Sequence, residues 1–96
     1  MIPKNKSIME YPTLRFVFDR KKVATKEKKG LVQIEVCSER KRKWIGTGVK
    51  VYADQWDDKR KVSARPDSLD LNMKLDLMMS NILEYVNSLI RRKVPF

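Results

Sequence analysis

The feature that most constrains the fold is a long amphipathic segment in the C-terminal third of the sequence. At about 100° per residue, one set of apolar side chains falls on a stripe roughly 140° wide. These side chains are Leu71, Leu75, Met78, Met79, Ile82, Leu83, Val86, Leu89 and Ile90. Asp67 follows the helix-stopping Pro66 and is a suitable N-cap, while Pro95 prevents extension at the other end. The pattern predicts a helix from about residue 69 to residue 92, which needs an apolar surface to pack against.

Three segments earlier in the chain alternate apolar and other residues with the period of two that is typical of half-buried strands. They are TLRFVFDR from Thr13, LVQIEVCS from Leu31 and the β-branched KWIGTGVKV from Lys43. A lysine-rich connection joins the first two, and a short turn over residues 39–42 precedes the third. The sequence therefore predicts a three-stranded antiparallel meander. Its apolar face would carry Leu14, Phe16, Phe18, Val32, Ile34, Val36, Ile45, Thr47, Val49 and Val51.

A sheet with one apolar face and a helix with one apolar stripe bury both surfaces by packing together. We therefore expect an α+β fold in which a three-stranded antiparallel sheet packs on one long C-terminal helix. The expected division is a flexible tail (1–12), a domain (13–93) made of sheet (13–51), connection (52–66) and helix (67–93), and a tail or the start of a linker to a further domain (94–96). Trp56 in the connection should tuck against the end of the sheet.

The helix should be longer than the sheet. About 24 helical residues span about 36 Å, whereas strands of about seven residues span about 23 Å. About two turns of the apolar stripe would then extend beyond the strands. Either the excess is covered from within the chain, or it docks on a following domain or a second copy. The candidates for internal cover are Ile8, Met9, Tyr11, Tyr52 and Trp56.

The positive charge is concentrated in the first half of the chain. The sequence has 22 Lys or Arg and 12 Asp or Glu, a net charge of +10. Residues 1–50 hold 14 basic and 5 acidic residues, whereas residues 51–96 hold 8 and 7. Two basic runs, over residues 20–29 and 40–43, fall at the turns of the expected sheet. Such runs are often only solvated loops, but this arrangement, with Trp44 after the second run, favours a polyanionic partner.

The composition excludes most enzyme classes. Histidine is absent, and the single cysteine, Cys37, cannot form an internal disulfide. The commonest general base and the commonest zinc ligand are therefore missing, and we expect no catalytic site, metal or cofactor. No apolar run approaches the about 20 residues of a membrane span. The first residues lack the apolar core of a secretion signal, so we expect a cytoplasmic protein.

Several segments in order resemble a known family. These are RFVFDRKKVATKEKKGLVQIEV, the basic turn, KWIGTGVKVYADQWD and the long helix. Together they resemble the N-terminal arm-type DNA-binding domain of phage and conjugative-transposon tyrosine recombinases, especially integrases of Bacteroides-like elements. The resemblance covers about residues 13–92. It implies that the sheet lies in the major groove of arm-type sites, and that core-binding and catalytic domains follow in the parent enzyme.

If the expected sheet lies in the major groove, the alternation of its strands indicates which side chains would meet DNA. The bare face of the sheet supplies the candidates for base contacts: Arg15, Val17, Gln33, Glu35 and Trp44. The basic runs supply the candidates for phosphate contacts: Arg20, Lys21, Lys22, Lys28, Lys29, Arg40, Lys41, Arg42 and Lys43. Arg15 is the first candidate for a guanine, because its fork can donate to O6 and N7; the alternative is a cross-strand pair with Glu35. A chain without histidine lacks the catalytic set of this family, so we expect no tyrosine to be a nucleophile and expect Tyr85 to pack against the fold.

Two other functions stay open. A sheet with an exposed aromatic and basic loops also suits RNA or another single strand, although Trp44 is the only clear stacking residue. Leu69, Met73 and Leu77 form a second apolar row on the helix. This row is either a minor irregularity or a surface for self-association or another protein. The expected partner remains double-stranded DNA at the bacterial nucleoid, bound by a domain of a mobile-element integrase.

Overall fold

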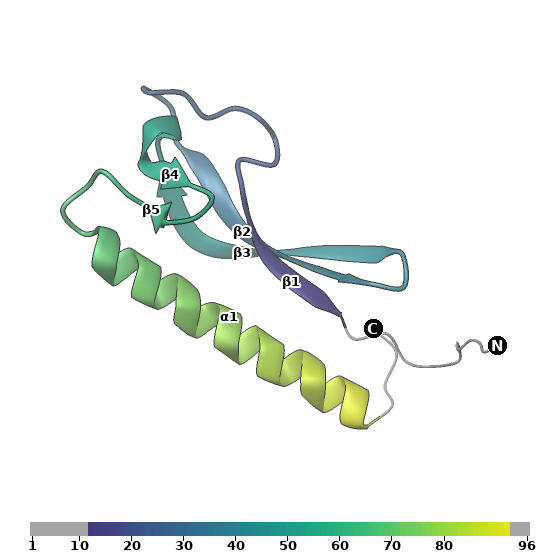
Figure 1. Cartoon of the computed structure of the whole chain (residues 1–96). Helices are drawn as coiled ribbons and strands as arrows, with labels where there is room; N and C mark the ends of the chain where they lie inside the picture. Colours follow the sequence, from purple (N-terminus) through teal and green to yellow (C-terminus); the bar gives the residue numbers. More distant parts are fainter. Residues whose placement is uncertain (1–11, 93–96) are drawn as a thin grey trace.

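The computed structural model describes residues 12–92 and has one sheet layer lying across one long helix (Figure 1). Its elements are β1 (Thr13–Phe18), β2 (Gly30–Ser38), β3 (Lys41–Val51), a 3-10 turn (Ala53–Gln55), β4 (Trp56–Asp57), β5 (Lys61–Val62) and α1 (Ser68–Arg91). The main sheet has the order β1-β2-β3 with both pairs antiparallel. The expected α+β fold is therefore confirmed.

The core lies between the sheet and the helix, as the alternating pattern predicts. In the register of β1 with β2, Leu14 lies opposite Val36 and Phe16 lies opposite Ile34. One cluster joins Val32, Val49, Val51 and Val62 to Leu75 of α1, and a second joins Ile34 and Val36 to Val86. Full burial of each such side chain contributes about 1.5–3 kcal/mol. This burial holds the helix on one face of the sheet.

Strand β3 contains an irregularity that the sequence pattern did not predict. Gln33 pairs with Gly46 but Leu31 pairs with Lys50, so β3 uses four residue steps where β2 uses two. The Thr47 hydroxyl donates to the Val32 carbonyl at 2.7 Å and accepts from the Val49 amide at 3.1 Å. Because the excess is an even number of residues, the apolar residues of β3 keep their side of the sheet on both sides of this bulge.

The connection to the helix is more structured than a loop. The Trp56 ring stacks on Phe18 with centroids 5.6 Å apart and meets Phe16 edge-on at 6.5 Å, which confirms the expected place of this tryptophan. Strands β4 and β5 form a small second sheet that was not predicted. The Asn72 side chain of α1 accepts from the Val62 amide at 2.9 Å and donates to the Val62 carbonyl at 3.0 Å. This small sheet lies over the N-terminal half of the helix (Figure 1), and its Val62 and Trp56 join the cluster around Leu75. Ile8, Met9 and Tyr11 lie outside the described residues.

The observed helix, Ser68–Arg91, begins and ends one residue before the helix that the apolar stripe predicts over residues 69–92. Asp67 is the N-cap residue, but its side chain does not cap the helix; it forms an ion pair with Arg65 instead. Tyr85 is 62% exposed, so the expectation that it packs against the fold was wrong: it lies too far from the stripe centre to reach the sheet. No helix in residues 12–92 combines the length and hydrophobicity that a membrane crossing needs.

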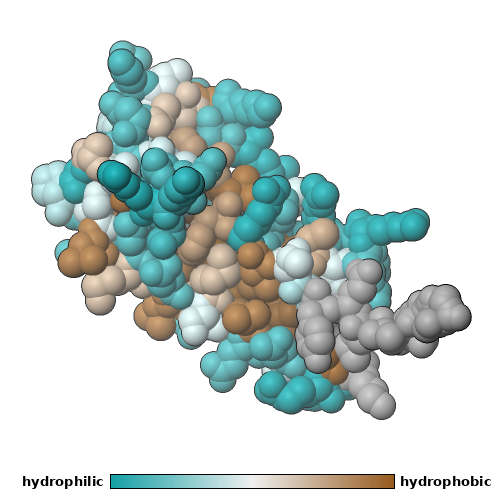
Figure 2. All heavy atoms as spheres, viewed as in Figure 1, coloured by the Kyte–Doolittle hydropathy of each residue, from teal (hydrophilic) through white to brown (hydrophobic). Residues whose placement is uncertain are grey.

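The second apolar row of the helix is at the surface. Leu69, Met73 and Leu77 are exposed and lie roughly opposite Leu75 around the helix axis. Figure 2 shows hydrophobic side chains at the surface along α1, among hydrophilic ones. Association through this row stays a prediction.

Candidate nucleic-acid interface

The face of the main sheet that turns away from α1 carries three rows of side chains to which all three strands contribute, and Leu31 and Lys50 continue it beyond the bulge. We call this surface the open face. The register places one residue from each strand in each of these three rows. The first row is Thr13, Cys37 and Arg42, the second is Arg15, Glu35 and Trp44, and the third is Val17, Gln33 and Gly46. All five predicted base-contact residues therefore lie together on one surface.

The middle row is joined through the carboxylate of Glu35. Nε of Arg15 donates to Oε2 at 2.8 Å, and Nη2 of Arg15 lies 3.5 Å from Oε1. Nε1 of Trp44 donates to Oε1 at 3.1 Å. The Glu35 side chain is only 8% exposed, whereas the Arg15 side chain is 67% exposed. Glu35 thus forms the floor of the row, and Arg15 projects from it.

Arg20 lies over the same row from the connection between β1 and β2. Its guanidinium carbon is 4.1 Å from the centroid of the Trp44 ring, a distance typical of a cation–π contact. Trp44 is 37% exposed. The indole is therefore held on two sides, by Glu35 at its nitrogen and by Arg20 over its ring.

The connection that carries Arg20 is folded rather than extended. Both carboxylate oxygens of Asp19 accept backbone amides, from Val23 and Ala24 at 2.8 Å each. The Ala53 amide donates to the Thr25 carbonyl at 3.0 Å and ties the loop to the 3-10 turn. The basic side chains of this loop therefore project from a fixed scaffold, and all of them are exposed: Arg20, Lys21, Lys22, Lys26, Lys28 and Lys29.

A family model described as an arm DNA-binding domain matches residues 17–95. The chain belongs to this family. Arm DNA-binding domains are typical of the N-termini of tyrosine recombinases and integrases, and they are binding modules rather than catalytic ones. No curated protein and no solved structure matches the sequence.

The arm domain has its two basic groups at opposite ends of the sheet. The nine residues of β2 separate them, which corresponds to about 30 Å. The second group departs from the prediction of a turn over residues 39–42. Only Glu39 and Arg40 form the turn, with φ values of 50° and 71°, because a two-residue turn of this hand matches the twist of the strands.

Residues 41–43 of the arm domain are consequently strand residues whose side chains alternate between faces. Arg42 lies opposite Cys37 on the open face, while Lys41 and Lys43 lie opposite Ser38 and Val36 on the side of the helix. The second basic run is thus divided between both faces of the hairpin.

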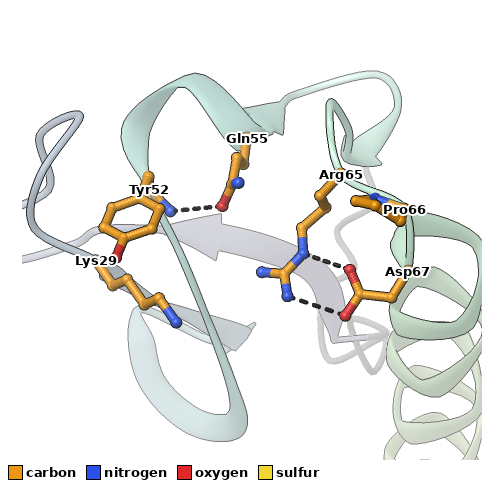
Figure 3. A pocket seen from close by; sticks show the side chains of 6 residues that line it. All are labelled: Lys29, Tyr52, Gln55, Arg65, Pro66 and Asp67. Carbon is orange, nitrogen blue, oxygen red and sulfur yellow. Dashed lines mark hydrogen bonds and ion pairs between the residues drawn. The ribbon is translucent and has the colours of Figure 1, made fainter.

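Lys29 faces a different part of the arm domain. Its ammonium lies 5.4 Å from the centroid of the Tyr52 ring, at the border of a hollow of about 370 Å³ next to the start of α1 (Figure 3). Arg65 and Asp67 form an ion pair in this hollow, and Arg65 lowers the pKa of the Asp67 carboxyl. The carboxylate of Asp67 is therefore paired with Arg65, while Lys29 lies against the Tyr52 ring at the border of the hollow.

The sequence pattern missed one part of this interface. Arg20 was assigned only to the phosphate group, and its place over Trp44 depends on the φ of 54° at Asp19, for which the sequence has no clear signal. Within the described residues, no group of three His, Cys, Asp or Glu side chains could hold a metal ion.

The contribution of the Glu35 carboxylate to the stability of the arm domain should decrease at acid pH. The hydrogen bond from Arg15, more than any other contact, lowers the pKa of Glu35 below its ordinary value of 4.5, while burial opposes the shift. A depressed carboxyl pKa stabilises the fold above the unfolded-state pKa, and this contribution is lost as the pH falls through the folded-state value. In urea unfolding, wild type should therefore exceed Glu35→Gln in stability most at pH 7, and the difference should shrink below about pH 4. Asp57 and Asp67 also have lowered pKa values. Wild type and Glu35→Gln both retain these two carboxyls, so their titration cancels in the difference between the two proteins. A difference that does not change with pH would contradict this role of Glu35.

Proposed function

We propose that this arm domain binds double-stranded DNA with its open face in the major groove of arm-type sites, as part of a site-specific tyrosine recombinase. The observation that carries the proposal is the middle row of the open face, where Glu35 holds Arg15 and Trp44 beneath Arg20. The parent protein would be a strand-breaking and rejoining enzyme of a mobile element in a bacterial cytoplasm. Its core-binding and catalytic domains would be further partners.

The width of the sheet supports this placement. Three strands about 4.8 Å apart make a ribbon about 10 Å across, and the major groove of B-DNA is about 12 Å wide. The opposite face of the main sheet could not enter the major groove in the same way, because α1 and the small sheet of β4 and β5 form a second layer over it.

Arg15 is oriented for a base. Its Nε–Nη2 edge faces Glu35, so the Nη1–Nη2 end of the fork is left for O6 and N7 of a guanine. The cross-strand pair with Glu35, which was predicted from the sequence as the alternative to a guanine contact, is present. In this proposal the pair holds the guanidinium in the orientation that a guanine contact needs. Glu35 is a positioning residue in this proposal, because its own carboxylate is nearly covered.

The other rows suit weaker readout. Gln33 can donate to and accept from an adenine, and Val17 can contact a thymine methyl. Trp44 can contact a thymine methyl or a deoxyribose with the part of its ring that Arg20 does not cover. The two basic groups would reach phosphates beyond both ends of the contacted bases and fix the register.

The salt dependence of binding tests the electrostatic part of the proposal. If about five of the basic side chains reach phosphates, log K for a duplex should fall with log[salt] with a slope of about −4.5. Fluorescence anisotropy with a labelled duplex at several salt concentrations gives this slope. Lys22→Ala should reduce its magnitude by about 0.9, whereas Arg91→Ala, at the far end of α1, should leave it unchanged.

The same assay separates the proposal from the single-strand alternative. Trp44 is the exposed aromatic of the open face that would favour a single strand, but Arg20 occupies one side of its ring. Unlabelled duplex should therefore compete far better than its separated strands. A slope near zero, or better competition by the single strand, would contradict the proposal.

A further inference from the structure

Gly46 lies in the third row of the open face, next to Trp44 along β3 and opposite Gln33. Glycine in the interior of a strand is unfavourable, because it loses more backbone entropy on folding than other residues and has no side chain to pack. The preference of strands for other residues therefore does not explain the glycine at this position.

At the other two glycines the fold itself excludes or disfavours a side chain. At Gly30 an added Cβ would lie 2.8 Å from the Cβ of Ala24, too close for any side chain. Gly48 has a φ of 80° at the bulge of β3, a conformation that other residues rarely adopt.

Gly46 has neither a close contact like that of Gly30 nor a positive φ like that of Gly48. Apart from Gly46 itself and its two neighbours in the chain, no described residue has an atom within 4 Å of the place that a Cβ would take. The fold would accept a larger residue here, so the absence of a side chain leaves space on the open face that the domain itself does not use.

We infer that Gly46 is the point of closest approach of the DNA, where a deoxyribose-phosphate unit lies directly against the bare backbone of β3. This inference rests on the proposed function and goes beyond it by naming the contact. β3 is an outer strand of the three-stranded sheet. In a ribbon about 10 Å wide within a groove about 12 Å wide, an outer strand is the one that meets the groove wall, and that wall is the sugar–phosphate backbone.

For Gly46→Val we expect a lower affinity for duplex DNA without a loss of thermal stability. A β-branched residue suits a strand and reduces the entropy of the unfolded chain, so Tm should stay the same or rise by about 2–6 °C. The added side chain occupies the space that the deoxyribose needs, so duplex affinity should fall about tenfold. Gly46→Ala should lie between wild type and Gly46→Val in affinity.

The experiment uses the full 96-residue chain and two labelled duplexes. One is enriched by the wild-type chain from a random-sequence library, and the other is a scrambled duplex of equal length. Because a backbone contact is independent of sequence, Gly46→Val should weaken both complexes by the same factor. Ser80→Val, on the exposed outer side of α1, is the control for added bulk and should bind as wild type does.

Each outcome decides the question. Loss of affinity for both duplexes with unchanged or raised Tm supports the inference. Wild-type affinity in Gly46→Val overturns it, as does a fall in Tm together with affinity, which would make Gly46 a requirement of folding. Loss for the selected duplex alone would place a base edge at Gly46 and would also overturn it. If the wild-type chain binds neither duplex, the proposed function itself fails.

Discussion

Arg15→Ala should remove most of the sequence discrimination of the arm domain. A bidentate arginine contact to guanine contributes about 1–3 kcal/mol of discrimination, so affinity for a selected duplex should fall about 5-fold to 150-fold, with a much smaller loss on a scrambled duplex. The Arg15 side chain is 67% exposed, whereas the side chain of its partner Glu35 is 8% exposed. The measurement is the ratio of the two affinities at one salt concentration.

Two further variants separate readout from simple charge. Arg15→Lys keeps the charge but not the fork, so it should bind scrambled duplex normally and still discriminate poorly. Glu35→Gln keeps Arg15 but weakens its support, and it should show a smaller loss of discrimination than Arg15→Ala. Equal loss on both duplexes in Arg15→Ala would show that this residue contacts only phosphate.

Leu75→Ala should have the largest effect on stability, about 2–5 kcal/mol. Leu75 is 0% exposed and packs in one cluster with Val32, Val49, Val51 and Val62, so the truncation leaves a cavity where the helix, the main sheet and the small sheet meet. In a domain of this size the loss corresponds to a fall in Tm of about 10–30 °C. Thermal or urea unfolding measures it.

Leu77→Ala is the matched control for this prediction. It removes the same atoms from the same helix, two residues away, at a position that is 63% exposed. Its effect should stay within about 0.5 kcal/mol. If the two variants were equally destabilised, the assignment of the buried side of α1 would be wrong.

The fold could be predicted to a large extent because its two periodic patterns are regular. Alternation in β1 and β2 identified the buried face, and the stripe through Leu75 and Val86 identified the side of the helix that packs on it. The missed features depend on contacts between distant residues. The small sheet of β4 and β5 is held by Asn72, a polar helix residue whose role is invisible without its partners, and the bulge at Thr47 depends on the carbonyl of Val32.

The site was predictable in composition but not in its connections. Alternation placed Arg15, Gln33 and Trp44 on one face, and the register confirms that placement. The burial of Glu35 and the position of Arg20 over Trp44 require knowledge of side-chain directions and of one left-handed residue, Asp19. The division of residues 41–43 between the two faces follows from where the turn ends, and the boundaries of turns are the least regular part of a sequence pattern.

The two tryptophans of the chain lie on opposite faces of the sheet and offer the most direct test of the central claim. Trp44 lies on the open face, and Trp56 packs on Phe18 on the side of the helix. In the ¹⁵N-labelled full chain, titration with a selected duplex should shift the indole N–H signal of Trp44 and the amides of its neighbours in the middle and third rows. The indole signal of Trp56 and the amides of α1 should stay in place. Shifts at Trp56 and along α1, with Trp44 unchanged, would contradict the claim that the open face binds DNA.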